Sequence, residues 1–85
     1  MDEYEIARRA SALPDQFAAR LPADTLEGLK EMEGGGEFGE LVIELAATLA
    51  KTRAEVSSAE QRELRALLEA TAMPTSPVDE LVVRD

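Results

Sequence analysis

The side chains of this chain that can do chemistry are almost all carboxylates. Its 85 residues include 18 Asp and Glu against 9 Lys and Arg, and they contain neither His nor Cys. Without His, the commonest general base and the commonest transition-metal ligand are missing. Without Cys, no thiolate nucleophile, disulfide or cysteine metal site is possible. The composition therefore predicts a binding protein and not an enzyme, with no catalytic residue, no metal site and no cofactor.

The carboxylates are concentrated between Asp24 and Glu44, where the only basic residue is Lys30. Within this stretch, Glu27–Glu31 and Glu40–Glu44 are like-charge pairs one helical turn apart, and each costs roughly 0.2–0.5 kcal/mol. One interpretation is an electronegative surface that attracts a basic partner and pairs with its Arg and Lys side chains. The other is an ordinary solvated helix face. On the first interpretation the candidate partner-binding residues are Asp24, Glu27, Glu31, Glu37, Glu40 and Glu44.

The net charge of −9 limits the classes of partner. It argues against direct binding of nucleic acid or of an anionic membrane, and it permits a basic protein partner. The acidic N-terminal stretch, Met1 to Arg9, lacks the apolar core of a secretion signal. No apolar run reaches the roughly 18 residues that a bilayer-spanning helix needs. We therefore expect a cytoplasmic protein whose partner is another protein.

The element that must position three of these acids is a central helix over about residues 37–53. Its apolar residues recur at helical spacing on one face, which predicts burial, and further apolar residues extend that face around most of the circumference. The polar residues of the helix form a narrow stripe that begins with Glu37, Glu40 and Glu44. The residues of the buried face are Phe38, Leu41, Val42, Leu45, Ala46 and Leu49.

The rest of the chain predicts helices around this one. The first helix should break near Ala12, because Pro14 cannot donate the next backbone hydrogen bond, and a short second piece should end near Arg20. A third helix should follow Pro22 and stop at Gly34 to Gly36, which are interpreted as a turn and not as a phosphate-binding loop.

A last long helix should open at Ser57, which forms a capping-box pattern with Glu60. Within it, Arg65 and Glu69 are spaced to form an ion pair. For residues 74–85 the sequence permits two conformations, one more helical turn or an extended end. The expected fold is all-α, a single domain over residues 1–85, with four main helices and a short C-terminal segment.

Two segments of the chain resemble the MafI-type immunity proteins, a family of contact-dependent toxin immunity proteins. The first is LPADTLEGLKEMEGGGEFGELVIELAATL and the second is EVSSAEQRELRALLEATAM, and together they cover about Leu21 to Met73. The shared features are a Leu-Pro start to an acidic helix, a Gly-Glu step into the central helix, and a Val-Ser-x-x-Glu opening to the last helix. The resemblance implies a cytoplasmic antidote that binds the toxic C-terminal domain of a secreted toxin one-to-one. That domain is often a nuclease, and nucleases are usually basic.

The alternative is a regulatory or scaffolding adaptor, including a homodimer. Such a protein would offer a partner the apolar surplus of the central helix, at Ile43, Ala47 and Ala50. An exposed apolar patch is the usual mark of a protein-binding surface.

Overall fold

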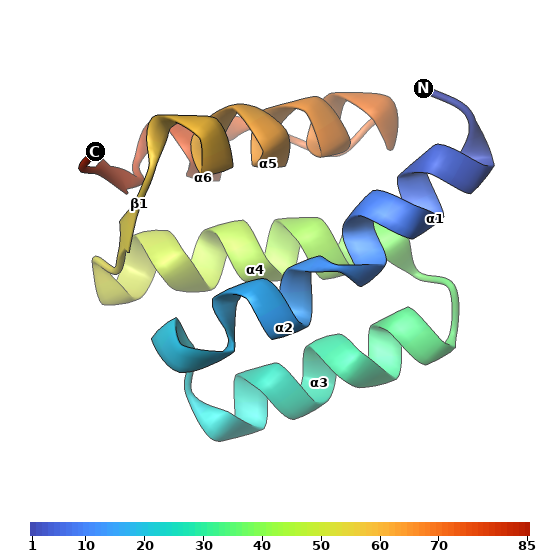
Figure 1. Cartoon of the computed structure of the whole chain (residues 1–85), viewed down its shortest axis with the longest axis horizontal. Helices are drawn as coiled ribbons and strands as arrows, with labels where there is room; N and C mark the ends of the chain where they lie inside the picture. Colours follow the sequence, from blue (N-terminus) through green and yellow to red (C-terminus); the bar gives the residue numbers. More distant parts are fainter.

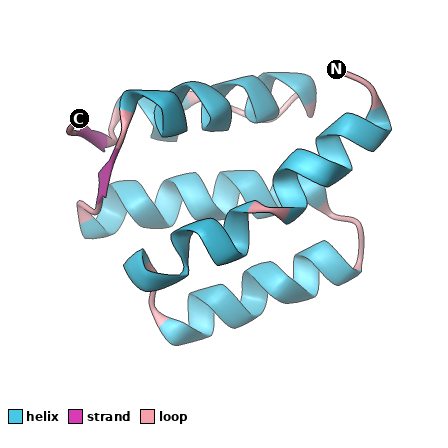
Figure 2. Cartoon of the chain, in the orientation of Figure 1, coloured by secondary structure: helices cyan, strands magenta, loops and turns pink.

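Helix α4 (Phe38–Thr52) lies at the centre of the computed structural model, which describes all of residues 1–85. It packs against α1 (Glu3–Ser11), α3 (Ala23–Gly34), α5 (Ser58–Ala70) and α6 (Ser76–Asp79). Helices make up most of the chain, with loops and two short strands between and after them (Figure 2). This confirms the all-α fold and the central helix, with Glu37 and Arg53 as its capping residues. The inward side of α4 is fully buried and consists of Leu41, Val42, Leu45, Ala46 and Leu49.

The expected break at Pro14 divides the N-terminal segment into α1, α2 (Leu13–Phe17) and a single 3-10 turn, η1 (Ala18–Arg20). Pro14 lies in the first turn of α2, where its missing N–H costs nothing. The break lets the chain change direction while Leu13 and Phe17 stay fully buried.

Helices α3 and α4 run antiparallel and are joined by a glycine turn (Figure 1). Gly36 has φ of +72°, a left-handed conformation that costs glycine little. Gly39, in the first turn of α4, serves a different purpose. A Cβ at this position would lie 3.1 Å from Cβ of Thr71 and 3.1 Å from Cγ of Met73. Glycine therefore allows the end of α5 to approach α4 closely.

The C-terminal segment contains both of the alternatives left open by the sequence. Helix α6 is one turn that buries Val78, and Leu81 is also buried. The chain then becomes extended, and β2 (Val82–Val83) pairs in parallel with β1 (Glu55–Val56). The backbone N–H of Arg84 continues this ladder by donating to the carbonyl of Val56 at 2.8 Å.

Two arginines fasten the N-terminal segment to α5. The Arg9 guanidinium donates to the Glu63 carboxylate and, on its own helix, to Glu5. Arg20 makes two 2.8 Å hydrogen bonds to Glu60. Glu60 also completes the predicted capping box, since it accepts from the Ser57 N–H at 2.9 Å. One carboxylate thus satisfies an exposed helix terminus and joins two elements.

The Glu60 contacts predict a loss of stability in acid. The Arg20 guanidinium, aided by the Ser57 N–H and Gln16, lowers the pKa of Glu60 to about 2 from a usual value of 4.5. A carboxylate with a lowered folded-state pKa stabilises the fold above pH 4.5, and this contribution is lost as the pH falls toward 2. Both side chains keep some contact with solvent. We therefore expect the Glu60 contacts to contribute about 1–2 kcal/mol to the free energy of unfolding at pH 7, and not the roughly 3 kcal/mol of a fully shielded pair.

Urea titrations between pH 7 and pH 2 measure this contribution. Glu60→Gln keeps a side chain suited to the capping box, but it removes the charge that pairs with Arg20. The variant should therefore be less stable at pH 7 and lose less stability on acidification than the native chain. Parallel pH curves for the two proteins would contradict the role given to Glu60.

Candidate functional site

Three of the six predicted partner-binding residues lie on the outward face of α3. Asp24, Glu27 and Glu31 are all exposed. At about 100° of rotation per residue they fall within roughly 60° of one another. Leu29, on the opposite side of the helix, is fully buried. The fold therefore turns this strip of carboxylates directly toward solvent.

The other three follow one edge of α4. Glu37 is the residue that precedes the helix, and Glu40 and Glu44 come on the next two turns. All three are exposed, as are Ala47 and Lys51 farther along the same edge. The helix thus presents a charged edge to water, while its opposite side forms the core.

None of the six carboxylates takes part in an ion pair. The structure has six ion pairs, and their acids all come from outside the stretch Asp24 to Glu44. The one hydrogen bond to any of the six is local, from the Thr25 N–H to Asp24 at 2.9 Å. Lys30, the single base in the stretch, is 3.5 Å from Asp15 of α2. The negative charge is therefore left unneutralised by the fold.

The six residues form two strips on neighbouring helices and do not converge on one point. No three acidic side chains of the chain are grouped closely enough to hold a metal ion. Separate carboxylates spread over two helices are suited to several ion pairs with an extended basic surface. They also raise the rate at which such a surface is encountered.

The charge is also divided between the two ends of the bundle. The α3–α4 turn, the start of α1 and the end of α5 lie at one end (Figure 1). The helix turns that meet there contain Glu3, Glu5 and Glu40 and no Lys or Arg. The other end, with β1 and the C terminus, contains four of the nine cationic side chains of the chain. These are Arg20, Lys51, Arg53 and Arg84.

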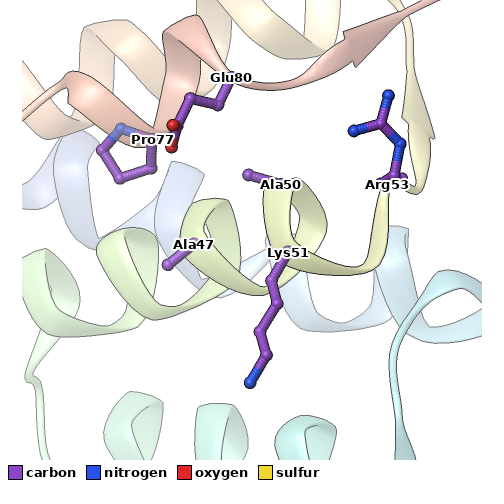
Figure 3. A pocket seen from close by; sticks show the side chains of 6 residues that line it. All are labelled: Ala47, Ala50, Lys51, Arg53, Pro77 and Glu80. Atoms are coloured by element: carbon purple, nitrogen blue, oxygen red, sulfur yellow. The ribbon is translucent and has the colours of Figure 1, made fainter.

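Three hollows indent the surface. The α4–α6 hollow, about 320 Å³, is lined by Ala47, Ala50, Lys51, Arg53, Pro77 and Glu80. In Figure 3 its Lys51 side chain points away from Pro77 and Glu80, which lie on the opposite wall. The α3–α4 hollow, about 290 Å³, contains Glu44 and Lys51. The third hollow, about 320 Å³, lies between the start of α1, the start of α4 and the end of α5. It is lined by Glu3, Ile6, Gly36, Phe38, Gly39 and Thr71 and is called the Glu3 hollow below.

No protein-family model, curated protein or solved structure matches the chain. None of the helices has both the length and the apolar character needed to cross a membrane.

The apolar patch that the adaptor alternative needs is mostly covered. Ile43 and Ala50 are half-buried and pack against the core, and of the three residues only Ala47 is exposed. The Glu3 hollow was not predicted from the sequence, because its walls come from segments far apart in the chain. The small residue at Gly39, inside an otherwise apolar helix, was the one local sign of a close approach there.

Proposed function

We propose that this chain is an immunity protein that neutralises a cognate toxin domain by binding it. The partner is a basic protein domain, a nuclease being the best fit to the charge, and the complex is one-to-one and cytoplasmic. Asp24, Glu27 and Glu31 of α3 pair with Arg and Lys of the toxin, together with Glu37, Glu40 and Glu44 of α4. On a nuclease they would occupy the place of the substrate phosphates.

The observation that carries this proposal is the absence of ion pairs among the acids from Asp24 to Glu44. Elsewhere six of the eleven acids form ion pairs, as in Arg9–Glu63 and Arg20–Glu60. Repulsion between like charges is a cost that a partner's cations would remove. The segment from Leu21 to Met73 resembles the MafI-type immunity proteins, and this resemblance also implies a toxin domain as the partner.

The size of the molecule supports a simple stoichiometry. Its accessible surface is 4824 Å², and a standard protein interface covers roughly 800 Å² of each partner. One partner would thus cover about a sixth of the surface. A second copy of the partner would have to bind elsewhere, on faces with mixed charge.

The test begins with the gene that lies beside this one. If that gene encodes a large secreted protein, its C-terminal domain is produced in cells with and without this chain. We expect growth arrest without the chain and growth with it, and co-elution of the two purified proteins as a one-to-one complex. An unrelated toxin domain serves as the control and should not be neutralised. Arrest that persists with the chain present, without co-elution, would refute the proposal.

A further inference from the structure

The Glu3 hollow combines an apolar wall with a single charged group. Ile6 and Phe38 are half-buried and line it, and Phe38 also packs against the core. Glu3 is exposed and takes part in no ion pair. Gly36 leaves the wall open, because a Cβ there would meet nothing within 4 Å. With a volume of about 320 Å³, the hollow lies at the lower end of the range for ligand pockets, roughly 300–1,000 Å³.

The other two hollows lack this combination. Lys51 lines both of them, and the α4–α6 hollow contains Arg53 as well. Their walls therefore carry charges of both signs and favour neither cations nor anions. The Glu3 hollow alone has charge of one sign beside apolar side chains.

The helix ends around the Glu3 hollow also favour a cationic ligand. The last turns of α3 and α5 contain no basic residue, and the first turns of α1 and α4 contain only acidic ones among their charged side chains. Glu37 precedes α4 directly beside Gly36 and adds a further acidic residue to this end of the bundle, although it does not line the hollow. A ligand suited to this place has an apolar stem and a cationic tip.

We propose that the Glu3 hollow receives one Arg or Lys side chain of the protein partner and so fixes the partner's position on the acidic surface. The aliphatic stem lies against Ile6 and Phe38, as long basic side chains do when they cover apolar surface. The cationic group reaches Glu3. This inference rests on the proposed function for the identity of the partner, but not for the binding of the side chain itself.

The experiment uses the whole chain and arginine blocked at both ends, N-acetyl-arginine amide, followed by amide chemical shifts in NMR titrations. We expect shifts that saturate in the millimolar range at Ile6, Gly36, Phe38, Gly39 and Thr71. Blocked citrulline, which has nearly the same shape but no charge, should leave those amides unmoved. Because no toxin is present, failure here would leave the proposed function standing, and success here would not depend on it.

Two variants and a matched control make the test specific to the hollow. Glu3→Gln should weaken arginine binding about two- to fivefold, the range of an exposed ion pair. Gly36→Asn tolerates the left-handed backbone and narrows the hollow, so it should weaken binding as well. Glu69→Gln removes the same charge from the last turn of α5, outside the hollow, and should have no effect. Equal effects of Glu3→Gln and Glu69→Gln, or shifts that spread over α3 without saturating, would overturn the proposal.

Discussion

A chain with Glu37→Gln, Glu40→Gln and Glu44→Gln together should associate about tenfold more slowly with the proposed toxin partner at low salt than the native chain does. Electrostatic steering accounts for rate differences of this size and larger, and it acts through charges that the fold leaves unpaired. The difference should shrink as salt is raised, since the screening length falls to roughly 3 Å at 1 M. Stopped-flow association rates at low and high salt measure both effects.

The control for this prediction removes charge from the other end of the bundle. Glu55 and Glu80 are exposed, and Glu55 pairs only with the exposed Arg84. Glu55→Gln with Glu80→Gln should slow association less, per charge removed, than the α4 substitutions do. Thermal unfolding should show that both variants fold. The melting temperature of the α4 variant should rise slightly, because the repulsion between its like charges is gone. Equal slowing by the two sets would mean that only net charge matters.

A chain with Leu45→Ala should lose about 3 kcal/mol of its free energy of unfolding, the middle of the range for a buried leucine. Leu45 has no exposed surface and lies at the middle of α4, which four other helices contact. For a domain of this size the melting temperature should fall by on the order of 15 °C. Urea and thermal unfolding, followed by circular dichroism, measure the change.

Glu44→Gln is the matched control for that substitution, since the two residues are adjacent on α4. Glu44 is exposed, so its replacement should change the free energy of unfolding by less than about 0.5 kcal/mol. The pair thus separates the core role of the helix at Leu45 from the partner binding proposed for Glu44. A Leu45→Ala variant that lost less than about 1 kcal/mol would place the centre of the core elsewhere.

The sequence predicted the helices well because their signals are local. The apolar spacing of α4, the break at Pro14 and the Ser57–Glu60 capping box each depend on residues a few positions apart, and all three are confirmed. The exposure of the six acids followed from the same helical periodicity. That they stay unpaired could not be predicted, because it depends on which basic residues the fold brings near them.

Contacts between residues far apart in the chain were not predicted, and one such contact overturned a local prediction. The expected Arg65–Glu69 pair is wrong, since Arg65 donates to Asp79 of α6 at 2.7 Å. No spacing rule links those two residues, and the longer-range Arg9–Glu63 pair went unpredicted for the same reason. The parallel pairing of β1 with β2 likewise joins residues 27 positions apart, Glu55 and Val82.

The unequal charge of the two ends has a consequence for how the molecule would approach a basic protein. Arg20, Lys51, Arg53 and Arg84 offset the acids at one end, while the end with the α3–α4 turn has no basic side chain in its helix turns. The centre of negative charge is therefore displaced from the centre of mass. The electric field of a positively charged protein would both attract the molecule and exert a torque on it. A basic toxin would rotate the chain so that the α3–α4 turn leads, before any side chains touch. Fewer encounters would then be spent in unproductive orientations.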